Sequence, residues 1–313
     1  MTNRALITGC EGFIGSFLAE FLVSQELEVY GTVFRDTKFV DHLSKKINIL
    51  RCDITEKDRI SAIVTEVKPD YIFHLAAKSL ISESWRDPEL TFKINITGTI
   101  NVLEAARAVR TNPLIEIVGS SAEYASPATP NVHIKESSVL RPSSPYSLSK
   151  MTADMLGHAY HQTFGLKVIR VRPFSIIGPR KTGDACSEFA QGIVDIESGE
   201  KSKLGVGNLE VIRDFLDVKD AIRAMWLLAE RGKPGEVYNI CSGKGTTIQV
   251  ILDKMISMSS HRITYEQVSE HMRLSDKPAI IGDCSKLKSL GWSPTIPLEN
   301  TLFNILEYWR SRN

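Results

Sequence analysis

The stretch "ALITGCEGFIGSFLAEFL", residues 5–22, decides the fold because it sets three glycines between an apolar strand and an amphipathic helix. Gly9, Gly12 and Gly15 have the spacing GxxGxxG. Glycine permits a tight turn and lets backbone amides approach a pyrophosphate at the positive N-terminus of a helix. A purely structural turn is the alternative. The strand before and the helix after this loop favour a dinucleotide-binding site.

Beyond this loop, short apolar segments alternate with longer amphipathic ones. The expected strands are residues 5–8, 28–34, 47–52, 71–76, 114–119 and 167–174. Apolar side chains at intervals of three and four predict the first helix: Phe13, Phe17, Leu18, Phe21 and Leu22. Buried strands that alternate with helices are typical of an α/β fold with a doubly wound parallel sheet.

The pattern changes after about residue 174, where segments containing Gly and Pro become frequent. Helices are still expected at 217–231 and 246–258. We therefore predict a dinucleotide-binding domain over residues 1–173, with a later return of the chain around 213–240. Residues 174–313 are expected to form mainly a smaller, loop-rich C-terminal lobe that binds substrate.

Composition excludes several classes of function. Lys and Arg number 38 against 37 Asp and Glu, so no strong overall charge indicates a nucleic-acid or membrane partner. The five cysteines are scattered without CxxC spacing, which predicts reduced thiols and no metal site. There is no leader and no apolar run of about 18 residues, so we expect a cytoplasmic protein with no membrane contact.

A second motif, "SPYSLSK" at residues 144–150, places Tyr146 and Lys150 four positions apart at the expected start of a helix. Residues i and i+4 share a helical face, so the ammonium of Lys150 can lie near the phenol of Tyr146. A nearby cation lowers the pKa of tyrosine from about 10, which would make Tyr146 a proton donor and acceptor. A surface Tyr–Lys pair is the alternative.

Ser120 completes the expected catalytic set. It lies in "IVGSSAEY", at the end of the fifth expected strand and about 25 residues before the tyrosine. Ser121 could serve instead, although the spacing to Tyr124 favours Ser120.

Together, GxxGxxG and YxxxK resemble the extended short-chain dehydrogenase/reductase superfamily over nearly the whole chain. The resemblance implies a Rossmann-type fold and an NAD(P)-dependent oxidoreductase, in which the hydroxyl of Ser120 would bind the oxygen that reacts. The residues that it assigns to the cofactor are Gly9, Gly12, Phe13, Ile14, Gly15, Arg35, Asp53, Ile54, Leu75, Ala76, Ala77, Tyr146 and Lys150. It also implies that "NITGT" at 95–99 braces the site, whereas His74 is more simply a packed histidine at a strand end.

The end of the second strand bears on the choice of cofactor. An acidic side chain there binds the ribose hydroxyls of NAD, and a basic one accommodates the phosphate of NADP. Val33 stands near the usual acidic position and Arg35 follows, which favours NADP(H). Asp36 leaves NAD(H) as an alternative, and Arg35 can equally be a solvated charge.

Later segments, at 206–228, 235–243 and 272–302, resemble enzymes that act on GDP-activated hexoses, most nearly GDP-4-dehydro-6-deoxy-D-mannose reductases. The resemblance implies reduction of a C4 ketone to give GDP-D-rhamnose or a close analogue. It assigns a GDP-sugar to Lys78, Ser121, Ser175, Arg213, Arg273 and Asp276, with the two arginines on the diphosphate. An ion pair of Arg213 with Asp214 or Asp217 is the alternative.

Two departures from related enzymes leave the substrate open. The 4,6-dehydratases need a carboxylate where this chain has Ala122, and Glu123 should point elsewhere if the segment is still extended. Where many relatives read "RPFN", this chain has Ser175 and then Ile176, so a heptose analogue or GDP-6-deoxy-talose stays open. An epimerase or 4,6-dehydratase with tightly bound NAD(P) is the alternative function, and a non-enzymatic NADP sensor is a third.

The resemblance also implies a homodimer, formed in part by the helix of the YxxxK motif. That helix carries the apolar residues Met151, Met155, Leu156 and Tyr160. Their spacing suits a buried core and a subunit interface equally.

Overall fold

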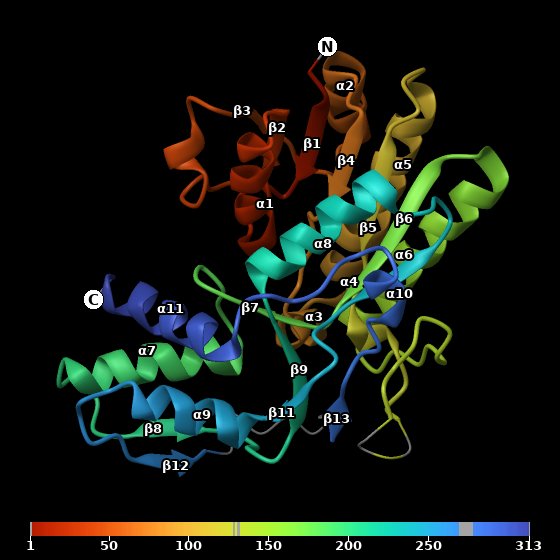
Figure 1. The fold of residues 1–313 in the computed structure, drawn as a ribbon. Coiled ribbons are helices and arrows are strands. Elements are labelled where there is room, and N and C mark those ends of the chain that lie inside the picture. Colours follow the sequence, from red (N-terminus) through yellow and green to blue (C-terminus); the bar gives the residue numbers. More distant parts are fainter. Residues whose placement is uncertain (1, 128, 130–131, 269–277, 313) are drawn as a thin grey trace.

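The structure is a computed structural model that describes residues 2–127, 129, 132–268 and 278–312. Its centre is a seven-stranded sheet in the order β3-β2-β1-β4-β5-β6-β10 (Figure 1). The strands are β1 (Arg4–Thr8), β2 (Glu28–Val33), β3 (Asn48–Arg51), β4 (Tyr71–His74), β5 (Leu114–Val118), β6 (Lys167–Pro173) and β10 (Val237–Ile240). All neighbours are parallel. The predicted α/β fold with a doubly wound Rossmann-type sheet is confirmed.

The order of the strands reverses between β1 and β4. From β1 the chain runs outward through β2 and β3, and it then returns to build β4, β5 and β6 on the other side. In the register of the sheet, Thr8 lies opposite His74, and His74 lies opposite Ile117. The carboxyl ends of β1, β4 and β5 therefore meet at one edge, which is where ligands bind in sheets of this type.

Helices cover both faces of the sheet. On one face, α1 (Phe13–Ser24) packs beside α8 (Val218–Arg231), and their apolar side chains share a core with Phe73 and Val171. On the other face lie α2 (Lys57–Val67), α5 (Gly98–Ala108) and α6 (Pro145–Phe164). The fully buried Ile60 and Leu103 belong to that second core. Each buried side chain of this size stabilises the fold by about 2 kcal/mol.

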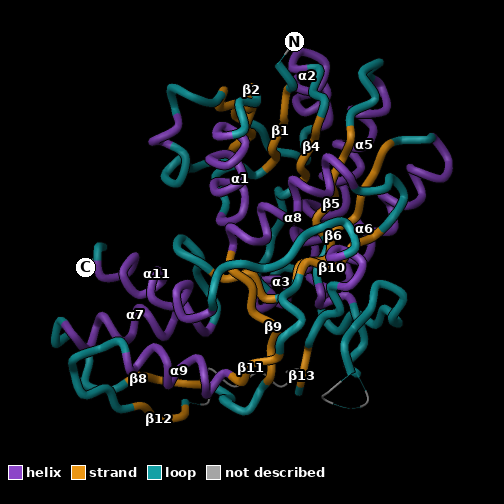
Figure 2. Tube along the Cα trace, viewed as in Figure 1, coloured by secondary structure: helices purple, strands orange, loops and turns teal. Residues whose placement is uncertain are grey.

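The remaining chain builds a smaller group of elements below the carboxyl edge in the view of Figure 2, with many connecting loops. Its helices are α7 (Ala185–Glu197), α9 (Ile248–Ser257) and α11 (Leu298–Arg310), which share a separate core. The short strands are β7 (Ser175–Ile177), β8 (Leu204–Val206), β9 (Ile212–Asp217), β11 (Gly245–Thr247), β12 (Tyr265–Gln267) and β13 (Ala279–Ile280). Short helices are α3 (Ile81–Arg86), α4 (Pro88–Phe92) and α10 (Ser285–Lys288), with 3-10 turns at Asp41–Leu43 and Ser121–Glu123 and a π turn at Lys93–Thr97.

The expected strands of the large sheet agree with the structure to within two residues at each end. The short strands were not anticipated, because five of the six have only two or three residues and carry no periodic pattern. The five cysteines are free and buried. None of the helices in the described part of the chain combines the length and the apolar character needed to cross a bilayer.

Candidate active site

The glycine loop is packed against its neighbours so closely that side chains would not fit. Gly9 has a φ of +69°, and a Cβ atom on it would lie 2.8 Å from the Cα atom of Ala76. A Cβ atom on Gly15 would lie 2.3 Å from the carbonyl oxygen of Gly9. Helix α1 then begins with Gly12 as its N-cap, without a side-chain cap and without an acidic residue in its first turn. The first amides of α1 are thus available to an anion.

Replacing Gly15 tests whether this packing serves cofactor binding. In Gly15→Ala the new methyl group must displace the backbone of Gly9, so we expect NADPH to bind at least about 10-fold more weakly. Fluorescence titration of NADPH measures the dissociation constant. The matched control is Gly165→Ala, because Gly165 also has a φ of +69° but has no atom near an added Cβ. That variant should lose about 1 kcal/mol of stability and bind NADPH as the wild type does. Equal affinity in both variants would contradict the assignment.

The end of β2 is held by the glycine loop. The Oε1 atom of Glu11 accepts a hydrogen bond of 2.7 Å from the backbone amide of Phe34, and burial raises the pKa of this carboxyl. Arg35 is exposed just beyond, with its guanidinium 4.8 Å from the ring centre of Phe34. Val33 is buried. Glu11 was missed in the sequence, where the only signal was an acidic residue inside a glycine loop.

The predicted adenine side lies after β3. The Oδ1 atom of Asp53 accepts hydrogen bonds from the amide of Thr55 at 2.9 Å and from its hydroxyl at 2.8 Å. This turn leads into α2. Ile54 is buried, and a Cβ atom on Gly98 would lie 2.4 Å from it, so α5 packs closely here.

The chain after β4 lies over the glycine loop. The hydroxyl oxygen of Thr8 accepts the amides of Leu75 and Ala76, both at 3.2 Å, which fixes the segment that ends at Ala77. His74 is buried, with Nδ1 at 2.8 Å from the hydroxyl oxygen of Thr8 and Nε2 at 2.9 Å from that of Thr99. Burial lowers the pKa of His74 to about 3, and the charge of Lys150 adds to this effect. The ring is therefore a neutral structural bridge.

The YxxxK motif forms the first turns of α6. Ser144 is the N-cap, and its hydroxyl oxygen accepts the amide of Ser147 at 3.1 Å. Tyr146 and Lys150 follow on the first two turns, and the ammonium of Lys150 donates to the carbonyl oxygen of Val118 at 2.7 Å. Ser120 interacts through its side chain with the hydroxyl of Tyr146. The structure thus brings Ser120, Tyr146 and Lys150 together at the carboxyl end of β5.

The pKa values of Tyr146 and Lys150 differ from the expectation. Burial raises the pKa of Tyr146, and a hydrogen-bonding interaction with Ser120 offsets only part of the rise. Burial also lowers the pKa of Lys150 to about 8. The prediction that Lys150 brings the pKa of Tyr146 below its ordinary value is therefore wrong for this structure, because desolvation of the phenolate is the largest effect. Tyr146 is a neutral proton donor here.

A π turn braces the far side of the trio. Asn95, within Lys93–Thr97, accepts the amide of Lys78 at 2.8 Å and donates to the carbonyl oxygen of Lys78 at 3.0 Å and to the hydroxyl of Ser149 at 2.8 Å. The ammonium of Lys78 lies 3.3 Å from the carboxylate of Glu83. Turns of this kind are frequent at functional sites.

The structure describes only some of the predicted sugar-binding residues. Ser121 starts a 3-10 turn, Ser175 starts β7, and Arg213 lies in β9, where its guanidinium donates to the carbonyl oxygen of Ile212 at 2.9 Å. Arg273 and Asp276 lie outside the described residues.

The two carboxylates considered as partners of Arg213 are engaged by other donors. Asp214 accepts the amides of Ser242 and Gly243 at 2.7 and 2.9 Å. Asp217 accepts the amide of Lys219 at 2.7 Å and the hydroxyl of Thr301 at 2.8 Å.

The segment after β5 is not extended, so the alternation assumed for Glu123 does not apply. The strand ends at Val118 and residues Ser121–Glu123 form a 3-10 turn. Glu123 is fully buried, and its Oε1 atom accepts the amide of Ser120 at 2.6 Å. Its Oε2 atom lies 3.2 Å from Nε of Arg172. This contact has no signal in the sequence, because only the fold brings the end of β6 beside β5.

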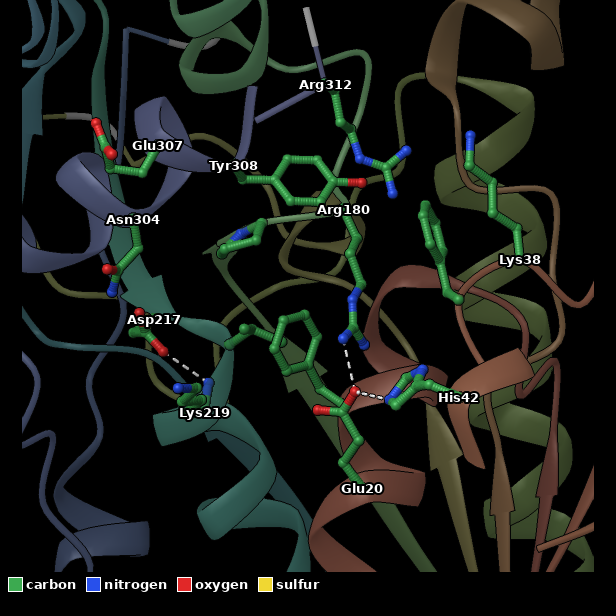
Figure 3. Close-up of a pocket in the computed structure, with 14 residues that line it drawn as sticks. Glu20, Lys38, His42, Arg180, Asp217, Lys219, Asn304, Glu307, Tyr308 and Arg312 are labelled. Atoms are coloured by element: carbon green, nitrogen blue, oxygen red, sulfur yellow. Dashed lines mark hydrogen bonds and ion pairs between the residues drawn. The ribbon is translucent and has the colours of Figure 1, made fainter. Parts of the chain in front are cut away.

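A separate cavity of about 620 Å³ lies between α1, the segment around His42 and α11 (Figure 3). Within it Glu20 accepts Nη2 of Arg180 at 2.6 Å and lies 2.8 Å from Nε2 of His42. None of the predicted catalytic or cofactor residues lines this cavity. In the described ranges, no group of three or more His, Cys, Asp or Glu residues is arranged to hold a metal ion.

Comparison with known proteins gives similarity along the whole chain. The family described as GDP-mannose 4,6 dehydratase matches residues 6–304. A GDP-6-deoxy-D-mannose reductase of Pseudomonas aeruginosa is 31% identical over 315 residues, which cover 100% of this chain and 99% of the reductase. A GDP-mannose 4,6-dehydratase of Vibrio cholerae is 26% identical over 96% of this chain and 91% of the dehydratase. The solved structure of RMD from Pseudomonas aeruginosa, complexed with NADPH, has a TM-score of 0.88 at 30% identity and covers 100% of both chains.

Proposed function

Because the chain belongs to the GDP-mannose 4,6 dehydratase family, within the extended short-chain dehydrogenases/reductases, we propose that it reduces the C4 ketone of a GDP-4-keto-6-deoxy sugar with NADPH. GDP-4-dehydro-6-deoxy-D-mannose is the proposed substrate, and GDP-D-rhamnose or a close analogue is the product. One observation carries the proposal: a complete trio of Ser120, Tyr146 and Lys150 stands beside Ala122, where a dehydratase needs a carboxylate.

The glycine loop supports a dinucleotide in this role. The close contacts of Gly9 and Gly15 leave the first amides of α1 free of side chains, as a pyrophosphate requires. Ala76 and Asp53 border the same edge of the sheet. When bound, NADPH would supply the hydride for the ketone carbon.

The side chains of the trio bind the ketone oxygen and supply its proton. Ser120 and Tyr146 would both donate hydrogen bonds to the ketone oxygen, which acquires negative charge as the carbon is reduced. Tyr146 then transfers its proton to that oxygen, because its raised pKa keeps it protonated beforehand. The ammonium of Lys150 stabilises the phenolate that remains.

NADP(H) is the preferred cofactor and NAD(H) remains possible. No carboxylate stands at Val33, and the nearby carboxyl of Glu11 is buried, with its Oε1 atom accepting the amide of Phe34. Arg35 is exposed at the end of β2, where it can meet a ribose phosphate. The similar Pseudomonas aeruginosa structure contains NADPH.

Arg35→Ala is expected to raise the KM for NADPH about 10-fold while the KM for NADH changes less than about 2-fold, because the guanidinium meets only the extra phosphate. Initial rates with both cofactors, at saturating sugar, give the two values. Arg51→Ala is the control, since Arg51 donates to the carbonyl oxygen of Arg35 and is a nearby exposed cation. Equal losses with NADPH and NADH would show that Arg35 does not select the phosphate.

The reaction itself is tested with purified protein, NADPH and GDP-4-dehydro-6-deoxy-D-mannose. We expect nicotinamide absorbance to fall by one equivalent for each keto sugar consumed, and mass spectrometry to detect a product heavier by two hydrogens. If several GDP- and UDP-linked keto sugars all leave NADPH unoxidised, the proposed reduction is wrong.

A 4,6-dehydratase is the second candidate, favoured by the matching family and by the Vibrio cholerae relative. It would convert GDP-mannose to a keto sugar without net oxidation of NADPH. Incubation with GDP-mannose alone distinguishes the two activities. We expect no keto product, because Ala122 cannot exchange a proton.

We also propose a homodimer formed through α6. Leu148 and Met155 on this helix are 41% and 38% exposed, whereas Leu156 and Tyr160 pack on the core of the sheet. Light scattering of the purified protein should give twice the chain mass. A monomer at micromolar concentration would contradict the proposed assembly.

A further inference from the structure

A buried cluster of charged residues lies directly behind the catalytic trio. Asp154 of α6 binds Arg170 at 2.9 Å and Arg172 at 2.8 Å, both from β6. Glu123 adds a second carboxylate, 3.2 Å from Nε of Arg172. All four residues are at most 7% exposed. The reaction proposed above uses none of them.

Glu123 differs from Asp154 because it also holds the catalytic segment. Its Oε1 atom accepts the backbone amide of Ser120 at 2.6 Å. The hydroxyl of Ser120 accepts the amide of Ala122 at 3.1 Å, so both ends of this turn are hydrogen-bonded. The backbone of Ser120, which carries the hydroxyl beside Tyr146, is therefore held by a carboxyl oxygen of Glu123.

The backbone at Gly119 lies against the carboxyl of Glu123. A Cβ atom on Gly119 would lie 2.4 Å from Oε1 of Glu123 and 3.3 Å from the carbonyl oxygen of Val171. A side chain at position 119 would therefore have to displace the carboxyl of Glu123 from its present place. Binding of Arg172 does not by itself explain why a carboxyl is present here, because Asp154 already binds that guanidinium.

Charge links Glu123 to the other two catalytic residues. Glu123 faces Lys150, Tyr146 and Asp154 of α6, and it faces Arg172 of β6. Burial raises the pKa of Glu123 to about 8, with Asp154 acting in the same direction and Arg172 and Lys150 against it. In return, Glu123 raises the pKa of both Lys150 and Tyr146. Below about pH 8 Glu123 is mostly neutral and acts through its hydrogen bond, whereas above that pH its charge favours the ammonium of Lys150 and the phenol of Tyr146.

We propose that Glu123 is a positioning residue for the proton transfer: its buried carboxyl accepts the backbone amide of Ser120 and so holds the catalytic segment beside Tyr146 and Lys150. This inference rests on the proposed role of Ser120, Tyr146 and Lys150. Glu123 does not contact the substrate in this account, and it acts only through these three residues.

Two substitutions separate the hydrogen bond from the charge. Glu123→Gln retains an oxygen that accepts the Ser120 amide, so kcat at pH 7 should stay within about 3-fold of the wild type. Its alkaline limb should move to lower pH by about 0.5 to 1 unit, because the supporting charge is lost. Glu123→Leu removes the acceptor, and kcat should fall about 30- to 100-fold with the KM for NADPH unchanged.

Glu116→Gln is the matched control, since Glu116 is a fully buried carboxyl on β5 whose burial also raises its pKa. It should leave both kcat and the pH profile as they are. Should Glu123→Leu fail to fold, Gly119→Ala replaces it, because the added methyl group displaces the same carboxyl oxygen. Unchanged kcat in Glu123→Leu or in Gly119→Ala, or an equal pH shift in Glu116→Gln, would overturn the inference.

A second readout needs no substrate. The ring carbons of ¹³C-labelled tyrosine report ionisation, and the Tyr146 signal is identified by its loss in Tyr146→Phe. In Glu123→Gln the pKa of Tyr146 should fall by about 0.5 to 1 unit, and in Glu116→Gln it should not change. If the wild type reduces no sugar but this shift is seen, the proposed function fails and the positioning role stands. If the wild type is active and neither readout moves, only the positioning role fails.

Discussion

Tyr146→Phe should lower kcat by about 1,000-fold, because the variant keeps the ring but loses the proton that the ketone oxygen must receive. The side chain of Tyr146 is half-buried beside Ser120, which limits the access of water that could replace the missing donor. Stopped-flow or steady-state assays of NADPH oxidation give kcat. The KM for NADPH should change by less than about 3-fold, since the variant removes one hydroxyl and leaves the glycine loop intact.

Tyr160→Phe is the matched control for this substitution. Tyr160 lies on the same helix, and its hydroxyl donates to Glu104 at 2.8 Å, away from the carboxyl end of β5. The variant should retain kcat within about 2-fold. A Tyr146→Phe protein with more than a tenth of wild-type activity would mean that another group delivers the proton.

Lys150→Met should lower kcat by about 100-fold or more, because no charge then stabilises the phenolate of Tyr146. In the wild type, burial lowers the pKa of Lys150 to about 8, so activity should decline above that pH as the ammonium is lost. The kcat profile between pH 6 and 10 measures this decline. A flat alkaline limb up to pH 10 would show that Lys150 is not required in its charged form.

The same substitution should stabilise the fold. A lysine whose pKa is lower in the folded than in the unfolded state binds fewer protons when folded, so its charge opposes folding below pH 8. This cost is relieved as the pH rises from about 8 to about 10.5. Lys150→Met should therefore have a higher midpoint temperature than the wild type at pH 7, with a free energy of unfolding larger by about 1 to 3 kcal/mol, and the difference should shrink at pH 10. A lower midpoint at pH 7 would contradict the assigned cost of burying Lys150.

The parts of the site that could be predicted from the sequence are those with local causes. The glycine spacing predicts the loop because a turn, a helix start and a close approach each require glycine at a fixed position. Tyr146 and Lys150 are related by one helical turn, which is a property of α6 alone. The long strands of the sheet show the same behaviour, because each is a buried apolar run.

The features that the sequence did not predict depend on contacts between distant segments. The pKa of Tyr146 is set by burial, which the neighbouring lysine could not indicate. The carboxylate of Glu123 meets Arg172 only because β5 and β6 are adjacent, and Glu11 meets Phe34 only because β2 lies beside β1. The division into domains at residue 173 and the sugar-binding roles of Arg213, Arg273 and Asp276 stay predictions.

The central claim is that the trio at the end of β5 serves the reduction of a sugar ketone, and isotope transfer tests it most directly. NADPH deuterated at the transferable position is incubated with GDP-4-dehydro-6-deoxy-D-mannose and the wild-type protein. The account predicts one deuterium at C4 of the product sugar, and loss of that product in Tyr146→Phe. A product without deuterium, or a labelled product formed equally well by Tyr146→Phe, would contradict it.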